Sequence, residues 1–395
     1  MQNDPLVFTI FLIFTGAAVV ATLALYARQA LLVAYIVLGI LFGPSGFGLV
    51  DDPVLVQQIS HVGIMFLLFL LGLNLPPAKL FPLLQETTLV TGLSSLAFAI
   101  AGIAAGWLLD FSIVESLVVG AALSFSSTII GLKLLPTTVL HHRRTGEIII
   151  SILLIQDVVA IFVLLLLQTA GRTTGQFDDA LPWLEIALRI AALPALILLA
   201  YLLERFVLRP LIARFDRIHE YIFLMTIAWC LGFAELAAGL GLSLEIGAFI
   251  AGVAMASNPI SLFIGESLKP LRDFFLILFF FSLGASFDLN MLATVLLPAA
   301  LLAAAVLAGK PLVFRGLLRK NGEASGRSTE IGMRLGQISE FSLLVAVLAL
   351  EVGVIGTQAS YLIQVTTVIT FIVSSYLIVL KYPTPIALTD KLRRD

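Results

Sequence analysis

The amino-acid sequence predicts an all-α integral membrane protein with 13 transmembrane helices, arranged as inverted repeats with two crossed discontinuous helices. Of the 395 residues, 60% are hydrophobic and only 12% are charged, whereas a soluble domain carries about 25% charged residues. No water-soluble core could absorb so many apolar side chains, but bilayer-spanning helices of about 20 apolar residues each can. The net charge of −2 gives no sign of a nucleic-acid partner.

The sequence shows few signs of disulfides, metal sites or catalytic motifs. The single cysteine, Cys230, excludes a disulfide within the chain and a thiolate metal cluster. We find no Gly-rich phosphate loop, zinc-ligand spacing or Ser-His-Asp arrangement in a plausible context, so we predict neither an enzyme nor a bound cofactor. The residues before the first apolar run, Met1 to Asp4, include no basic side chain, and this run is expected to be a retained helix rather than a cleaved signal peptide.

Apolar stretches between polar punctuation define the expected spans. They cover residues 6–26, 30–49, 57–76, 87–109, 112–134, 147–170, 183–208, 220–239, 241–257, 266–287, 290–314, 330–351 and 356–381. The division at 239–243 is the least marked, since only Gly239, Gly241 and Ser243 indicate a turn there.

The basic residues support this count. With 13 spans, 20 of the 23 lysines and arginines fall on one side of the membrane or in the C-terminal tail, and only Arg172 falls in an opposite loop. Cytoplasmic loops are enriched in Lys and Arg, so we expect a multi-pass protein of the cell inner membrane with its N-terminus outside and its C-terminus in the cytoplasm.

Three motifs recur with an offset of about 210 residues, which indicates an inverted repeat. Residues 38–43 resemble 246–252, residues 69–75 resemble 280–286, and residues 123–128 resemble 335–341. Because the offset covers seven spans, an odd number, the second half enters the membrane from the opposite side. We therefore expect one exchanger-type membrane domain, with repeats at about 6–170 and 220–381 joined by a linker helix at about 183–208.

Asp157 is the leading candidate for chemistry. It lies ten residues after Glu147 in an apolar span, which at 1.5 Å per residue is near the middle of a core about 30 Å thick. A carboxylate there costs roughly 2.5–3.5 kcal/mol unless it takes up a proton, binds a cation or pairs with a base. These are the requirements of a site that holds either H⁺ or a monovalent cation. The alternative is a buried aspartate tied only to a neighbouring helix.

Lys310 is the expected partner of Asp157. It lies nine residues before Arg319, at a matching depth, and a Lys–Asp pair could hold the empty site together until a cation or proton arrives. The alternative is a lysine whose charged end reaches the membrane surface.

Two spans carry dense polar clusters and are expected to be unwound at mid-membrane. The first holds Ser124, Ser126, Ser127 and Thr128; the second holds Gly336, Gln337, Ser339 and Glu340. Unwound helices expose backbone carbonyls and opposed dipole ends, which suit a partly dehydrated K⁺ or Na⁺ ion. Packing of Ser and Thr between close helices is the alternative. Glu340 could instead cap a half-helix or pair with Arg334.

Four segments together resemble the monovalent cation:proton antiporter-2 family, especially its Kef-like and plastid-type potassium/proton branch. They are LGILFGP at 38–44, QD at 156–157, LSLEIGAFIAG at 242–252 and GQISEF at 336–341. The resemblance covers essentially the whole chain. It implies a sodium/proton-antiporter-like fold and a homodimer with a static dimer domain and a moving core. It also implies ion or proton binding at Gln156, Asp157 and Lys310.

Two departures from the family pattern stand out. Asn74 stands where many relatives carry an acid, and the chain stops shortly after its last span, where many Kef-like members continue into a cytoplasmic nucleotide-binding domain. We therefore expect no regulatory domain in this chain, and a separate cytoplasmic regulatory subunit as a possible partner. Electrogenic relatives carry two adjacent acids where this chain has Gln156 and Asp157.

The expected function is electroneutral exchange of a monovalent cation, K⁺ favoured and Na⁺ possible, for H⁺ by alternating access. A Na⁺-coupled organic-anion symporter is the alternative, since such carriers share crossed broken helices. A cation channel ranks third, because a channel needs no inverted repeat. Apart from the ions and membrane lipid, no further ligand is expected.

Overall fold

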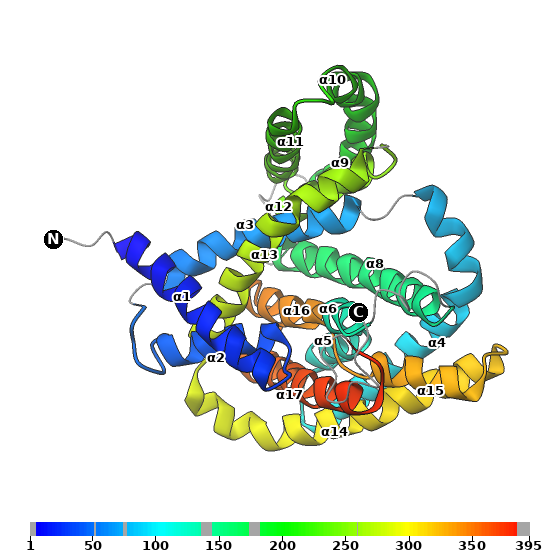
Figure 1. Cartoon of the computed structure of the whole chain (residues 1–395). Helices are drawn as coiled ribbons and strands as arrows, with labels where there is room; N and C mark the ends of the chain where they lie inside the picture. The colour runs from blue at the N-terminus through cyan, green and yellow to red at the C-terminus, as the bar shows by residue number, and fades with distance from the viewer. Residues whose placement is uncertain are drawn as a thin grey trace. The chain divides into compact units, whose positions relative to one another are not determined.

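The computed structural model describes residues 5–50, 53–73, 77–135, 144–173, 182–258 and 260–384, and in these ranges every regular element is a helix. Figure 1 traces them along the chain. The helices are α1 (Pro5–Tyr26), α2 (Leu31–Phe42), α3 (Pro53–Leu73), α4 (Pro77–Leu108), α5 (Ile113–Leu123), α6 (Thr128–Lys133), α8 (Arg144–Thr173), α9 (Pro182–Leu203), a π-helical turn (Glu204–Leu208), α10 (Arg209–Arg214), α11 (His219–Gly239), α12 (Leu244–Met255), α13 (Ser261–Ala285), α14 (Leu289–Lys320), α15 (Ser325–Arg334), α16 (Glu340–Glu351) and α17 (Thr357–Lys381).

Each of the 13 predicted spans coincides with a helix, and the two spans predicted to be unwound are each divided into two helices, α5 with α6 and α15 with α16. Within the described residues, six helices are long and apolar enough to cross a membrane by themselves: α11, α14, α17 and parts of α1, α4 and α8. The span expected to reach residue 49 ends at Phe42, because Pro44 has no N–H to continue the helix. Two features of the resemblance, Asn74 and the C-terminal tail from residue 385, lie outside the described residues.

Helix starts follow local side-chain chemistry. Ser112 and Glu115 form a capping box at the start of α5, and the Ser243 hydroxyl accepts a hydrogen bond from the Ile246 N–H at the start of α12. Gly241 before it has a positive φ of 76°, which glycine adopts without steric penalty. The weakest predicted boundary, at 239–243, is therefore a true turn between two helices.

The chain divides into two compact units. Unit 1 comprises Met1–Ala17, Tyr35–Pro82 and Gly175–Phe287; unit 2 comprises Ala18–Ala34, Leu83–Thr174 and Asp288–Asp395. Unit 1 contains all of α3, the helices from α9 to α13, and most of α2. Unit 2 contains α5, α6, α8 and the helices from α14 to α17. Each unit thus draws helices from both halves of the sequence, and every candidate site residue belongs to unit 2.

Unit 1 is built on two glycine-mediated helix crossings. Gly39 of α2 and Gly284 of α13 each pack directly against backbone of the other helix, and Gly72 of α3 and Gly252 of α12 do the same. A side chain at any of these glycines would collide with a carbonyl group. Small residues let membrane helices approach this closely. The first crossing joins predicted spans two and ten (α2 and α13), and the second joins spans three and nine (α3 and α12). In the predicted repeat, span two corresponds to span nine and span three to span ten, so the two crossings are equivalent.

A buried arginine joins several helix ends in unit 2. Arg334, fully buried at the end of α15, donates to the Leu134 carbonyl just after α6, at 3.0 Å, and to the Pro383 carbonyl after α17, at 2.9 Å. Its Nε pairs with Glu330 at 3.0 Å. The partner of Arg334 is therefore Glu330, and the ion pair with Glu340 that the sequence left open is not formed.

We expect Gly252→Ala to lower the melting temperature of the detergent-purified protein, because the added methyl group must push α3 and α12 apart. Overpacking of this kind costs about 1–3 kcal/mol. Gly232→Ala, on α11 of the same unit, is the matched control, since a methyl group there meets only open space. Equal melting temperatures for the two variants would contradict the close crossing.

Candidate functional site

The two unwound segments lie at the centre of unit 2. Helix α5 ends at Leu123 and α6 begins at Thr128, while α15 ends at Arg334 and α16 begins at Glu340. We call residues 124–127 the first break and residues 335–339 the second break. All nine residues are buried. Irregular backbone is tolerated at membrane depth only where protein or a cavity satisfies it, so the contacts of these breaks decide what the site can do.

The two breaks contact each other. The Ser126 hydroxyl donates to the Leu335 carbonyl at 2.9 Å, and the Gln337 side-chain amide lies 3.4 Å from the Ser127 carbonyl. Each break ends in a serine that caps the following helix: Ser127 accepts from the Ile130 N–H, and Ser339 accepts from the Phe341 N–H, both at 3.1 Å. The two discontinuous helices expected from the sequence therefore meet at their breaks.

Lys310 of α14 reaches both breaks with its ammonium group. Its Nζ donates to the Phe125 carbonyl at 2.6 Å and to the Gln337 carbonyl at 3.1 Å. It also lies 3.4 Å from the Ser126 hydroxyl and 5.2 Å from the centre of the Phe98 ring. The two carbonyls follow the C-terminal ends of α5 and α15, where helix dipoles place partial negative charge. A single buried cation thus stabilises both C-terminal ends.

The predicted ion pair between Lys310 and Asp157 is wrong for this structure. Both residues are described and buried, but no ion pair within 4 Å joins them, since the ammonium of Lys310 is directed to the carbonyls of Phe125 and Gln337. The proposal that Lys310 reaches the membrane surface is wrong as well, since its side chain is 1% exposed. Both residues are buried as expected, but the partner of Lys310 was predicted wrongly, because spacing along the chain does not show which groups the fold brings together.

Asp157 of α8 is directed to the start of α6. The Thr128 hydroxyl lies 3.1 and 3.0 Å from the two carboxylate oxygens of Asp157, which is 2% exposed. The Glu340 carboxylate interacts with Asp157 electrostatically. Thr128 and Glu340 are the first residues of α6 and α16, and helix N-termini carry partial positive charge. The site therefore places acids at the positive helix ends and a lysine at the negative ends.

Gln156, next to Asp157, positions the first break. Its Oε1 accepts from the Ser126 N–H at 3.0 Å, and its Nε2 donates to the Ser124 carbonyl at 3.2 Å. Both ends of the amide are thereby satisfied in a fully buried place. A charged acid at this position could not donate to Ser124, so the neutral Gln suits this backbone conformation.

Sequence analysis missed the contribution of α17. Thr370 accepts a hydrogen bond from the Ile338 N–H at 3.2 Å, and Ser374 donates to the Gln337 Oε1 at 3.0 Å. The available signal was a run of hydroxyl side chains within the last apolar span: Thr366, Thr367, Thr370, Ser374 and Ser375.

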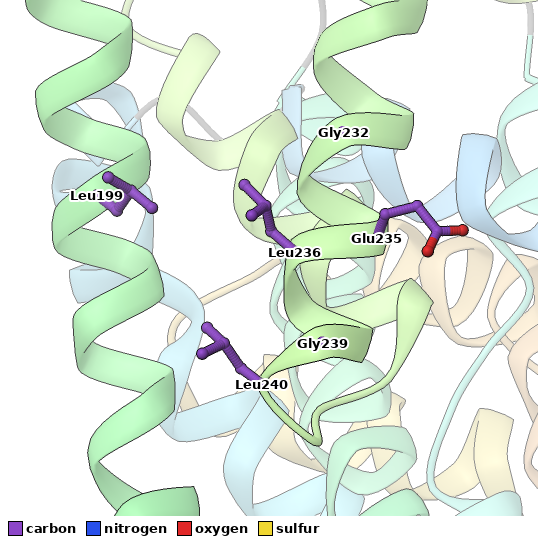
Figure 2. A pocket seen from close by; sticks show the side chains of 6 residues that line it. All are labelled: Leu199, Gly232, Glu235, Leu236, Gly239 and Leu240. Atoms are coloured by element: carbon purple, nitrogen blue, oxygen red, sulfur yellow. The ribbon is translucent and has the colours of Figure 1, made fainter.

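Elsewhere in the described part of the chain, no group of three or more His, Cys, Asp or Glu side chains is placed to hold a metal ion. A groove of about 510 Å³ lies in unit 1, between α9 and α11. Figure 2 shows Leu199 of α9 facing Leu236 and Leu240, with Gly232 and Gly239 on α11 and Glu235 directed away from Leu199. This groove is apolar apart from Glu235, so it lacks the converging polar groups found at the breaks.

Comparison with known proteins identifies the family of the chain. Residues 10–380 match the family described as sodium/hydrogen exchanger, transmembrane. The chain belongs to this family. As a family member it is a multi-pass membrane transport protein, and its fold is that of the cation/proton antiporters.

One relative and two solved structures illustrate the match. The K(+) efflux antiporter 4 of Arabidopsis thaliana is 30% identical over 357 residues, which are 89% of this chain and 60% of that protein. The chain thus spans less than two thirds of the length of this relative. Two structures of the sodium proton antiporter MjNhaP1 from Methanocaldococcus jannaschii superpose with TM-scores of 0.67 and 0.65, at 17% identity. They cover 93% and 95% of this chain and 94% and 96% of theirs.

We expect Lys310→Met to lower thermal stability, because the carbonyls of Phe125 and Gln337 lose their shared donor, at roughly 1–3 kcal/mol for buried polar groups left unsatisfied. Since Asp157 is not the direct partner, Asp157→Asn should not rescue this variant. A double-mutant cycle of Lys310→Met and Asp157→Asn, measured by melting in detergent, checks this. A coupling energy near the roughly 3–5 kcal/mol of a broken buried ion pair would restore the Lys310–Asp157 pair.

Proposed function

We propose that this chain is a secondary active antiporter that exchanges a monovalent cation, K⁺ in preference to Na⁺, for H⁺ by alternating access. The observation that carries the proposal is the position of Asp157. It is a buried carboxylate, bonded to Thr128 at the N-terminal end of α6, and Glu340, the first residue of α16, interacts with it electrostatically. The preference for K⁺ rests on the name of the relative, a K(+) efflux antiporter.

The chemistry of Asp157 supports exchange. An ionised carboxylate at this depth is stable only with a positive charge close to it, and Lys310 is committed to the backbone of the breaks. Asp157 can then be neutralised by a proton or by a dehydrated monovalent cation, and the two exclude each other. Thr128, Ser126, Ser127 and Ser339 offer hydroxyl oxygens near the same place, which suit a hard cation.

The alternative of a Na⁺-coupled organic-anion symporter is not retained, because the family is one of sodium/hydrogen exchangers and the relatives named above are antiporters. Such a symporter also needs a substrate pocket beside the breaks. The groove described above is in unit 1, away from the breaks in the sequence, and it is lined by leucines, glycines and Glu235.

The proposal also covers the repeat organisation of the chain, its oligomeric state and its orientation in the membrane. We propose that repeats at 6–170 and 220–381 are inverted, with 183–208 as linker; the paired glycine crossings and the equivalent contacts of the two breaks support this. We also propose a homodimer in the cell inner membrane, with the N-terminus outside and the C-terminus cytoplasmic, and regulation by a separate cytoplasmic subunit. The distribution of basic residues supports the orientation.

Asp157→Asn is expected to abolish exchange without unfolding the protein, because the amide keeps the shape but cannot cycle a proton. The measurement is cation-driven proton movement in proteoliposomes that contain a pH-sensitive dye, with K⁺, Na⁺ or Li⁺ added. Glu235→Gln, which neutralises an exposed acid on α11, is the matched control and should exchange normally. Retained exchange in Asp157→Asn would exclude Asp157 as the carrier.

Exchange should be one for one and therefore electroneutral, because Gln156 is neutral and Asp157 alone holds either one H⁺ or one cation. A two-proton mechanism would move one net charge, worth roughly 2.3 kcal/mol per 100 mV. Proteoliposomes with and without an imposed potential should reach the same transport equilibrium, and solid-supported membrane recording should show no transport current. A current that disappears in Glu340→Gln would instead identify Glu340 as a second proton carrier.

A further inference from the structure

The two breaks are equivalent in their contacts, position by position. Phe125 and Gln337 both give their carbonyls to Lys310, Ser127 and Ser339 both cap the next helix, and Thr128 and Glu340 both begin it. All three pairs are separated by the same number of residues in the sequence. The fourth pair with this separation is Ser126 and Ile338, so the two N–H groups at these positions should be held in equivalent ways.

The acceptors of these two N–H groups come from different residue types. The Ser126 N–H donates to Gln156 of α8, 30 residues further along the chain. The Ile338 N–H donates to the Thr370 hydroxyl of α17, 32 residues further along. Each break is therefore held through one backbone N–H by the next membrane helix in its own half of the sequence.

The hydrogen-bond directions fit this role. The Thr370 hydroxyl donates its own proton to the Thr367 carbonyl at 2.8 Å, which leaves a lone pair of the oxygen for Ile338. One turn later, Ser374 donates to the Gln337 Oε1, and this leaves the Gln337 Nε2 to face the Ser127 carbonyl of the first break. Gln156 alone accepts from the first break and donates to it; on α17, Thr370 accepts from the second break and Ser374 donates to it, here to a side-chain oxygen instead of a backbone carbonyl.

We infer that Thr370 and Ser374 of α17 are positioning residues of the ion site, and that Thr370 is the second-half counterpart of Gln156. They act through the second break: Thr370 fixes the backbone at Ile338, and Ser374 orients Gln337, whose carbonyl holds Lys310 and whose amide faces Ser127. The inference rests on the proposed exchange function. It assigns α17 a part in shaping the cation pocket, beyond packing against α14 and α16.

The chain offers matched controls on α17 itself. Thr366 is fully buried and its hydroxyl bonds to the Leu362 carbonyl of its own helix. Ser375, beside Ser374, is 1% exposed, and its hydroxyl has no hydrogen-bond partner. Neither hydroxyl is hydrogen-bonded to a break. Thr370→Val can thus be compared with Thr366→Val, and Ser374→Ala with Ser375→Ala.

The experiment combines transport with backbone protection. Thr370→Val and Ser374→Ala should each raise the apparent KM for K⁺ in proteoliposomes by about fivefold or more, as loss of one buried hydrogen bond allows. The pH profile should keep its form, because Asp157 is intact. Hydrogen exchange by mass spectrometry should show faster deuterium uptake at 335–341 in Thr370→Val. Thr370→Ser, which keeps the hydroxyl, should restore both values, and the two control variants should match the wild type.

The outcomes separate this inference from the function it rests on. If the wild type exchanges K⁺ and Thr370→Val matches Thr366→Val in KM, the positioning role is overturned while the antiport function stands. If deuterium uptake rises without a change in KM, the contact is structural only and the inference is again overturned. If Thr370→Val does not fold, Ser374→Ala against Ser375→Ala decides by the same KM comparison. A wild type that exchanges no cation refutes the function itself.

Discussion

The structure of unit 2 depends on one interaction, the ammonium group of Lys310 on the carbonyls of Phe125 and Gln337. Two helices are unwound in a region where unpaired backbone groups are costly, and their C-terminal ends meet near one point. A single cation donates to both ends and also balances their partial negative charge. The Lys310 ammonium thus joins the two breaks, together with the hydrogen bond from Ser126 to the Leu335 carbonyl.

Charge is sorted by helix polarity at this site. Lys310 occupies the C-terminal ends of α5 and α15, while Asp157 and Glu340 are associated with the N-terminal ends of α6 and α16. Asp157 therefore has no lysine as a direct partner, and under the proposed function its charge is met by a cation or by a proton. Under the proposed function, an acid that is bonded only to a neutral hydroxyl can exchange its occupant more readily than one locked in an ion pair.

The equivalence of the two breaks does not extend to the acid. Gln156 is followed by Asp157, whereas Thr370, which takes the corresponding place in α17, is followed by Phe371, a fully buried aromatic residue. The backbone arrangement is thus close to symmetric, but the carboxylate comes from one half only. Under the proposed exchange function, this asymmetry accounts for a single exchangeable charge, and Glu340 is a further buried acid that interacts electrostatically with Asp157.

The sequence by itself determined the helical membrane fold, the place of both breaks and the burial of Asp157 and Lys310. The length of an apolar run, a cluster of polar residues and the position of a residue along a span are local properties of the sequence. The bilayer constrains each of them directly, because a span needs enough apolar residues and a polar group within it is costly. Only the tertiary structure decided which groups meet: Lys310 with two carbonyls rather than Asp157, Gln156 with the first break, and Thr370 and Ser374 with the second. Such pairings depend on the rotation and crossing of helices far apart in the sequence, and spacing along the chain carries no information about either.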